Sequence, residues 1–475
     1  MKKIKDQISM QSLMKQLFIV FTGLTLTVSC KKDDGTTTKP TLPVADRPIK
    51  DISGTLTGNI SWSKDTVYRL NGYVNVGVDS ILTTTTPQAT GTLTIEAGTV
   101  VIGQKGSLTT KPAALFIHRG SKLFAVGTAA SPIIFTSAQI DKAAGDWGGI
   151  ALCGKATNNL PGGFGTLEGG DGTPFFGGSD DADNSGTLKY VRIEYAGYAP
   201  LTDKELNSLT MASVGSGTTI SHVQCSFGKD DAFEWFGGTV NCDHLVAFKT
   251  QDDMFDTDNG FRGTVQFGLG YSSPNIADIS GSNGFESDND ATGSGNTPIT
   301  SASFYNITLV GPKSDSNKVI DGNFKRAAHI RRNSKLKIYN TVFSGFPTGI
   351  LIDGTLAEAN ATAGELIIKN SVNVGIDNWS GYKALAVNSG SSFDITAWYN
   401  ETAKNNASAT KVSDVGFNSS IYTTTAPSLL VSSGSILLSG GIGNGFATYR
   451  GAFDGTNDWT ADWTEFDPEN VEYVK

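Results

Sequence analysis

The amino-acid sequence predicts an all-β fold, a right-handed parallel β-helix with protruding loops and capped ends. The first observation is a repeat. Residues 229–234 (KDDAFE) return almost unchanged at 251–256 (QDDMFD), a spacing of 22 residues, which is about one coil of such a helix. The second is a series of short segments with alternating apolar residues, the pattern of strands with one buried face. The third is composition, since 56 of 475 residues are glycine and long amphipathic helical patterns are scarce.

The strands share one register along the chain. In segments 188–195 and 220–227, apolar residues at alternate positions are expected to face the interior. Coils of variable length, separated by loops, fit a solenoid better than a sandwich, whose turns come every 8–12 residues. The later strands, which carry Asn where the earlier ones carry Tyr or His, are 305–308, 339–342 and 369–372.

The N-terminal residues carry a targeting pattern. Four lysines surround or precede an apolar run at 17–28 that is too short to span a bilayer as a permanent helix. The run ends in residues 27–30 (TVSC), which resemble a lipoprotein signal-peptidase site with Cys30 as the residue that receives lipid such as palmitate. Residues 31–35 (KKDDG) resemble the export signal of Bacteroidetes-type lipoproteins. We therefore expect a lipid anchor in the outer membrane with the protein facing the cell exterior; a plain signal peptide or a free cysteine is the alternative.

The ends of a solenoid expose strand edges and need caps. Trp459 and Trp463 are expected to fold over the last coil, and the Gly-rich segments 158–185 and 276–300 are expected to protrude as loops. The predicted organisation is a signal peptide at 1–29, lipidated Cys30 with a flexible tether at 30–49, an N-terminal β cap at 50–90, the β-helix at 91–450 and a Trp-rich C-terminal cap at 451–475.

The net charge restricts the partners. Residues 1–29 contain four lysines and one aspartate; without them 33 basic and 45 acidic side chains remain, a net charge of −12. This charge argues against nucleic acid and anionic lipid headgroups and is compatible with cation binding. Cys153, Cys225 and Cys242 lack zinc-site spacing and are expected mainly as small buried residues, with a disulfide between two of them left open.

Several segments together resemble a family. These are 127–137 (GTAASPIIFTS), 145–150 (GDWGGI), 190–194 (YVRIE) and 230–238 (DDAFEWFGG), followed by the Trp-rich end. They resemble a poorly characterised group of Bacteroidetes β-helix lipoproteins with a pectin-lyase-like core, over most of residues 90–468. The resemblance implies the fold and the location but no established activity.

The 22-residue repeat predicts a ladder of acidic side chains. Stacked carboxylates about one strand spacing apart, roughly 4.8 Å, repel each other unless solvent, a basic side chain or a cation compensates. Hard cations such as Ca²⁺ take six to eight oxygen ligands, which such a ladder supplies. A solvated acidic turn is the other interpretation. The expected pairs are Asp230 over Asp252, Asp231 over Asp253 and Glu234 over Asp256.

Two further segments are rich in oxygen ligands. Residues 181–186 (DADNSG) match the first six positions of a calcium loop, with Asp181 and Asp183 as ligands. Arg192 occupies the position of the last ligand, so the segment is no EF-hand. Residues 286–290 (ESDND) form a weaker cluster. Together they favour bound Ca²⁺.

A catalytic site is the alternative use of the same acids. Parallel β-helices host many polysaccharide lyases and hydrolases, and Asp231 with Asp253 could act as acid and base on a glycosidic bond. A Ca²⁺-dependent lyase would need a basic residue, for which Arg331 is the candidate. The signatures of the β-helix pectin hydrolases are absent, and nothing in the sequence shows that His329 reaches the acidic face. Fold alone does not establish function.

His222 and His244 occupy the same coil position and are expected to stack. Two imidazoles could hold a transition metal. Because Tyr190 and Asn306 fill the equivalent position in other coils, a structural ladder is the favoured interpretation.

These observations lead to a functional prediction. We expect a surface-exposed outer-membrane lipoprotein that binds without catalysis and is stabilised by divalent cations. Its partner would be a polysaccharide, a peptide or an outer-membrane transporter of an uptake complex. The alternatives are a Ca²⁺-dependent polysaccharide lyase or glycoside hydrolase, and an adhesin or cell-surface assembly component.

Overall fold

The structure is a computed structural model that describes residues 46–107, 110–169, 174–198, 205–423 and 425–474. The chain divides into two compact units, Met1–Leu42 and Pro43–Lys475, and only the second contains described residues. The signal segment and Cys30 lie outside the described residues. None of the helices in the described ranges combines the length and apolar character that a membrane span requires.

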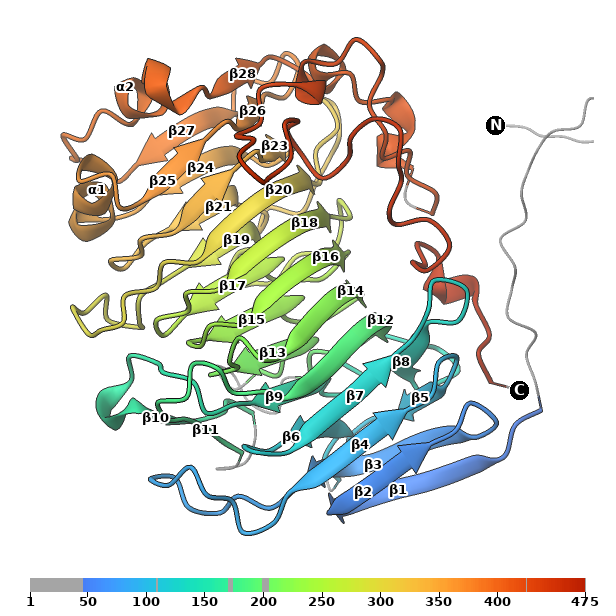
Figure 1. Ribbon diagram of the computed structural model, residues 1–475. Coiled ribbons are helices and arrows are strands. Elements are labelled where there is room, and N and C mark those ends of the chain that lie inside the picture. The colour runs from blue at the N-terminus through green and yellow to red at the C-terminus, as the bar shows by residue number, and fades with distance from the viewer. Residues whose placement is uncertain (1–45, 108–109, 170–173, 199–204, 424, 475) are drawn as a thin grey trace, which may run out of the picture. The chain divides into compact units, whose positions relative to one another are not determined.

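The second unit is a right-handed parallel β-helix, which confirms the predicted fold class (Figure 1). Each coil contributes strands to three parallel faces, and each strand pairs with its equivalent in the next coil, so that the backbone polar groups of one coil bond to the coils on either side. Face A consists of β2 (Gly58–Trp62), β4 (Gly91–Ile95), β7 (Lys122–Val126), the first halves of β12 (Gly186–Glu194), β14 (Thr219–Ser226), β16 (Asn241–Phe248), β18 (Thr264–Tyr271) and β20 (Ser303–Val310), then β22 (Lys337–Tyr339) and β25 (Ile367–Lys369).

Face B follows face A along each coil. It consists of the first halves of β1 (Ile49–Leu56) and β3 (Val67–Val76), β5 (Val100–Gly103), β8 (Ile133–Ser137), the second halves of β12, β14, β16, β18 and β20, then β23 (Val342–Ser344), β26 (Val372–Val374) and β28 (Ala407–Ala409).

Face C completes the coil. It consists of the second halves of β1 and β3, β6 (Ala114–Ile117), β9 (Ile150–Cys153), β13 (Leu209–Ala212), β15 (Phe233–Phe236), β17 (Phe255–Asp258), β19 (Asn283–Ser287), β21 (Arg326–Ile330), β24 (Thr348–Ile352) and β27 (Lys383–Val387).

The corner between faces A and B is built from residues with positive φ angles. Residues other than glycine rarely adopt this conformation, and among them Asn tolerates it best. Equivalent residues of successive coils therefore stack along the corner, with Asn in the later coils as the sequence indicates. These residues are Tyr190, His222, His244, Phe267, Asn306, Asn340 and Asn370.

The main core lies inside the coils. Aromatic side chains stack along it at strand spacing, as Phe233 and Phe255 do with ring centroids 5.9 Å apart. Cys225 pairs with Ala247 and Cys242 with Ile220, in the predicted register. The three cysteines of the described residues are buried and free, so no disulfide joins them.

A second apolar cluster lies outside the coils, on the outer side of face B. There the C-terminal residues cover Val246, Phe248 and other outward side chains of face B. Trp463 belongs to this cluster and contacts His222, far from the last coil. The expectation that the C-terminal tryptophans fold over the last coil is thus wrong, because the apolar surface that needs cover is the side of the stack.

The two ends of the stack also differ from the expected caps. Parallel pairing begins at Ile49, before the boundary expected at residue 91, because β1 already pairs with β3. At the other end α2 (Ile395–Tyr399) places Trp398 and Tyr399 in the main core. The remaining short elements are α1 (Thr355–Thr362), the hairpin β10 (Phe164–Thr166) and β11 (Phe175–Gly177), and 3₁₀ turns at Pro161–Gly163, Thr402–Lys404, Val412–Val415, Ser419–Tyr422, Ile436–Leu438 and Pro468–Asn470.

Candidate functional site

The outer side of face C carries a column of polar side chains. Glu234 on β15 pairs in register with Asp256 on β17, Asp256 with Glu286 on β19, and Glu286 with His329 on β21. Side chains alternate across a strand, and the intervening residues Phe233 and Phe255 point into the core. The four polar residues therefore project outward from four successive strands. These strands, β15, β17, β19 and β21, are labelled in Figure 1.

The predicted stacking of the repeat is confirmed. Phe233 pairs with Phe255 and Glu234 with Asp256. In the preceding turn the Asp253 N–H donates to Asp231 Oδ1 at 2.8 Å, and the Asn283 N–H donates to Asp253 Oδ1 at 2.5 Å. Asp231 and Asp253 are buried, and each accepts a hydrogen bond from the backbone of the next coil. Their position favours a structural role over that of an exposed acid or base.

Two groups of carboxylates in this region bring ligand oxygens within 4.8 Å of one another. The first group lies in the turns before β15 and β17. The second group combines Asp231 from the first of these turns with one acid on each strand. The residues are Asp230, Asp231 and Asp252 in the first group, and Asp231, Glu234 and Asp256 in the second. These are five of the six acids of the predicted ladder; the sixth, Asp253, adjoins them through the hydrogen bond from its N–H to Asp231.

Burial is the largest effect on the ionisation of these groups. It raises their pKa because the charged form loses hydration, and neighbouring carboxylates raise the pKa further by repulsion. For Asp252 and Asp258 the pKa rises to about 7. The pKa lies well above its usual value for Asp230, Asp231, Glu234, Asp253 and Asp256.

Two buried oxygens in the ladder have no hydrogen-bond partner among the described residues. They are Asp256 Oδ1 and Asn283 Oδ1. The Asn283 amide turns its nitrogen toward the acids: Nδ2 donates to Glu286 Oε2 at 3.3 Å and to Gly281 O at 3.0 Å, and it lies 3.4 Å from Asp253 Oδ2. Unpartnered buried oxygens are rare. Carboxylate and amide oxygens are the ligands of hard cations, so the donor set fits Ca²⁺.

The ladder ends in basic side chains. Arg331 contacts Glu286, and its Nε donates to Asp288 Oδ1 at 2.8 Å; Arg332 Nη1 donates to Asp288 Oδ2 at 2.8 Å. Burial raises the pKa of Glu286, but the hydrogen bond with His329 and the charge of Arg331 outweigh it, so the pKa lies below its usual value. Arg331 is thus held by two carboxylates.

Beside Arg331, a cavity of about 330 Å³ opens between Arg331, Arg332 and the first turn of α1.

His329 reaches the acidic face, which the sequence could not show. Its Nε2 lies 2.8 Å from Asp353 Oδ2 and its Nδ1 3.4 Å from Glu286 Oε2. Glu286 and Asn283 also join the ladder, although their segment appeared separate in the sequence. The spacings of 30 from Asp256 to Glu286 and of 43 from Glu286 to His329 hide the register, because long loops interrupt both coils.

Asp181 and Asp183 lie apart from the ladder. Asp181 Oδ2 accepts from Arg262 Nη2 at 2.8 Å, and Asp183 Oδ1 lies 3.4 Å from Lys155 Nζ. Each carboxylate is therefore compensated by a basic side chain. The structure does not bring the segment 181–186 together with other acids as a cation site.

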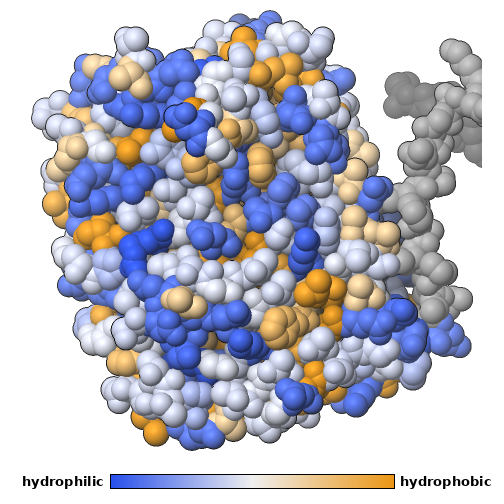
Figure 2. All heavy atoms as spheres, viewed as in Figure 1, coloured by the Kyte–Doolittle hydropathy of each residue, from blue (hydrophilic) through white to orange (hydrophobic). Residues whose placement is uncertain are grey.

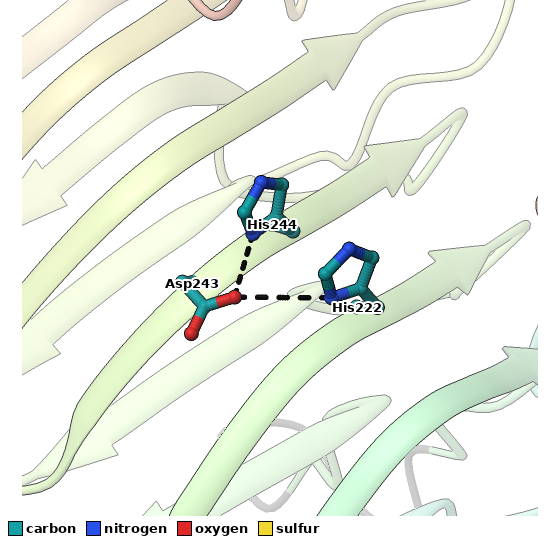
Figure 3. A group of neighbouring side chains, drawn as sticks. All are labelled: His222, Asp243 and His244. Atoms are coloured by element: carbon teal, nitrogen blue, oxygen red, sulfur yellow. Dashed lines mark hydrogen bonds and ion pairs between the residues drawn. The ribbon is translucent and has the colours of Figure 1, made fainter. Parts of the chain in front are cut away.

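The third group with metal-ligand side chains is His222, Asp243 and His244 (Figure 3). The imidazole rings stack with centroids 4.2 Å apart and planes 14° apart. The nitrogen lone pairs of stacked rings run nearly parallel, so they do not converge on a metal at about 2.0–2.1 Å from both. Tyr190 and Phe267 continue the stack on either side. The geometry favours the structural ladder.

The comparison with protein families agrees with the fold. Residues 54–464 match the family described as the pectate-lyase-like beta helix domain. One similar solved structure is the crystal structure of the Dettilon tailspike protein (gp208), with 10% identity and a TM-score of 0.26; the match covers 72% of this chain and 62% of that chain. No curated protein matches the chain.

Proposed function

The chain belongs to the pectate-lyase-like β-helix domain family, and on that premise we propose that it is a surface-anchored binding protein that holds divalent cations on face C and binds a polysaccharide there without cleaving it. The observation that carries the proposal is the ladder from Asp230 to Glu286, in which carboxylates of adjacent coils crowd together. A cation would relieve their repulsion and leave a polar surface on which sugar hydroxyls could complete its coordination.

The absence of free catalytic companions supports binding over cleavage. Asp231 and Asp253 accept backbone hydrogen bonds, and Arg331 is held by Glu286 and Asp288. A lyase base must instead be able to reach and deprotonate the substrate. The three residues considered for catalysis from the sequence thus all have structural partners.

The location is proposed from the sequence. Lipidation of Cys30 at the TVSC site, residues 27–30, would anchor the protein in the outer membrane. The lysine and aspartate residues that follow Cys30 would direct the protein to the cell exterior. An outer-membrane transporter is a fitting partner for a glycan-binding protein there. Labelling with a palmitate analogue tests the anchor: wild-type protein should be labelled and a Cys30→Ala variant should not, whereas equal labelling would refute it.

Cation binding is tested by calorimetry and thermal melts of the mature protein. Ca²⁺ at 100 times its Kd should stabilise the fold by about 2.7 kcal/mol. The double variant Glu234→Gln, Asp256→Asn should lose this gain. Asp181→Asn is the matched control and should keep it, because Asp181 is paired with Arg262. Wild-type melts that are identical with Ca²⁺ and with chelator would refute the cation site.

Glycan binding is tested on a glycan array with and without chelator. We expect retention of one glycan class that chelator abolishes, and the same loss in the Glu234→Gln, Asp256→Asn variant. Retention that is unaffected by both would place the glycan site elsewhere. Crosslinking to a surface protein without glycan retention would favour an adhesin.

One observation favours a hydrolase as the second candidate. Glu234 and Asp256 project from adjacent strands with oxygens within 4.8 Å of one another. Retaining glycosidases hold their two carboxyl groups about 5–5.5 Å apart. A hydrolase would release reducing ends from a glycan panel, and Glu234→Gln would stop the release while Asp181→Asn would not. No product from the wild-type protein on that panel would leave binding as the function.

A further inference from the structure

Residues 440–474 form a clasp that runs back along the side of the stack, from its last coils towards its first (Figure 1). Asn side chains of the corner between faces A and B hold its first part: Asn340 Nδ2 donates to Ala447 O at 3.1 Å, and Asn306 Nδ2 to Gly451 O at 3.0 Å. At its far end the Tyr473 hydroxyl donates to Glu194 Oε1 at 2.8 Å. The clasp thus ties together coils that are distant in sequence from it and from each other.

The middle of the clasp lies on the two stacked histidines. Trp459 meets His244 with ring centroids 5.0 Å apart, and Trp463 meets His222 at 5.6 Å, both nearly edge to face. Trp463 also contacts Tyr190 at 6.0 Å. The side chains of His222 and His244 keep only 17% and 23% of their exposure.

The two tryptophans of the clasp offer these histidines no acceptor. The Trp459 indole N–H donates to Ala452 O, and that of Trp463 donates to Trp459 O, so both are used within the clasp. The clasp residue Glu465 pairs with Arg192 instead. The tryptophans therefore present only apolar ring atoms to the imidazoles.

The coils supply one carboxylate for both rings. His244 Nδ1 lies 2.6 Å from Asp243 Oδ1 (Figure 3). Ser221 Oγ links the same oxygen to His222 Nδ1, at 2.6 and 2.8 Å. This network is complete when both imidazoles are neutral and carry their proton on Nδ1. The other charged group that acts on His222 is Lys189, which opposes its protonation.

We propose that the clasp is released by acid: residues 453–466 stay on the stacked histidines while His222 is neutral, and lift off when His222 gains a proton. In the closed state a His222 imidazolium would lie under the apolar clasp with the His244 ring 4.2 Å away, whereas in the lifted state it is hydrated. Release would uncover apolar residues of face B such as Phe248, which Phe466 contacts. This device is independent of the cation site on face C.

The size of the effect follows from linkage. Burial and the charge of His244 lower the pKa of His222 to about 4, while an exposed histidine has a pKa near 6.5. The closed state therefore binds the proton more weakly than the lifted state, and acid favours lifting. Between pH 8 and pH 5 the ratio of lifted to closed molecules should rise about 30-fold for this histidine alone.

Hydrogen exchange of peptides from residues 453–466, corrected for the intrinsic pH dependence of exchange, tests the proposal in the full mature chain. Protection should fall about 30-fold from pH 8 to pH 5. In the double variant His222→Phe, His244→Phe this pH dependence should vanish, because phenylalanine cannot take up a proton. The variant should fold, since Phe267 shows that the corner position accepts phenylalanine. If circular dichroism shows that this variant is unfolded, the pair His222→Gln, His244→Gln replaces it.

His118→Gln is the matched control. The pKa of His118 is also lowered to about 4 by burial, but its Nε2 lies 2.8 Å from Asn75, away from the clasp. The control should keep the pH dependence in residues 453–466. Wild-type protection that is unchanged between pH 8 and pH 5, or a pH dependence that persists in the folded variant without the two histidines, would overturn the proposal.

Discussion

At the scale of single residues, the second aspartate of the repeat has a physical explanation. Asp231 and Asp253 each accept the backbone N–H of the residue one coil further, and Asn283 occupies the same position in the following coil. The alignment of Asp231 with Asp253 was predictable from the 22-residue spacing. Their use as hydrogen-bond acceptors was not, because a sequence does not show which carboxylates are turned inward.

The Asn283 position leads to a prediction for Asp231. Asp231→Ala should destabilise the protein by about 1–3 kcal/mol, because it leaves the buried Asp253 N–H without an acceptor. Asp231→Asn keeps the acceptor and removes a crowded charge, so in chelator its stability should equal or exceed that of the wild type. Denaturant unfolding of both variants measures the difference. Equal losses for Ala and Asn would mean that the charge, and not the hydrogen bond, matters.

At the scale of elements, strands with one buried face were predictable from their alternation, but the clasp was not. Its partners lie far from it in the sequence: Gln224 and Glu465, which exchange two hydrogen bonds, are 241 positions apart. One signal was available. Leu245 to Phe248 is an unbroken apolar run, which indicates a strand buried on both faces. Face B therefore needed an outer cover, although the sequence did not say which segment supplies it.

The corner between faces A and B gives the element-scale prediction. Asn340 has a positive φ of 52°, donates to Asn306 Oδ1 and Ala447 O, and accepts from the Ile442 N–H. Asn340→Gly loses the hydrogen bonds but tolerates the conformation, whereas Asn340→Ala loses both. Alanine should therefore be less stable than glycine by about 1–2 kcal/mol, the cost of the left-handed conformation. Thermal melts of the two variants check this, and a glycine variant less stable than alanine would contradict it.

At the scale of the described unit, the fold class was predictable because the same alternating strand pattern recurs in coil after coil although the loops differ in length. The acidic site was predictable only where two coils have equal length. Asp230 to Asp256 follow from the 22-residue repeat, whereas Glu286 and His329 enter from coils with long loops. Asp181 and Asp183 matched a calcium loop by sequence, but Arg262 and Lys155 occupy the place a cation would take. Composition cannot distinguish a carboxylate that lacks a partner from one that has a lysine or arginine beside it.

The ladder also predicts how the stability of the protein changes with pH. Asp252 and Asp258 have a pKa of about 7 in the folded chain, against about 3.9 when unfolded. The folded state binds these protons more tightly, so the stability they contribute is complete below pH 4 and is lost as pH rises towards 7. The low pKa of His222 acts in the opposite sense below pH 6.5.

In chelator, the free energy of unfolding of the double variant Asp252→Asn, Asp258→Asn should therefore fall less between pH 4 and pH 7 than that of the wild type. Saturating Ca²⁺ should reduce the wild-type fall in the same way, because the cation stabilises the ionised carboxylates. Denaturant unfolding at pH 4, 5, 6 and 7, with and without Ca²⁺, measures both effects, and Asp181→Asn serves as the control that should follow the wild type. Parallel curves for the wild type and the double variant in chelator would show that these two carboxylates are ionised across the range.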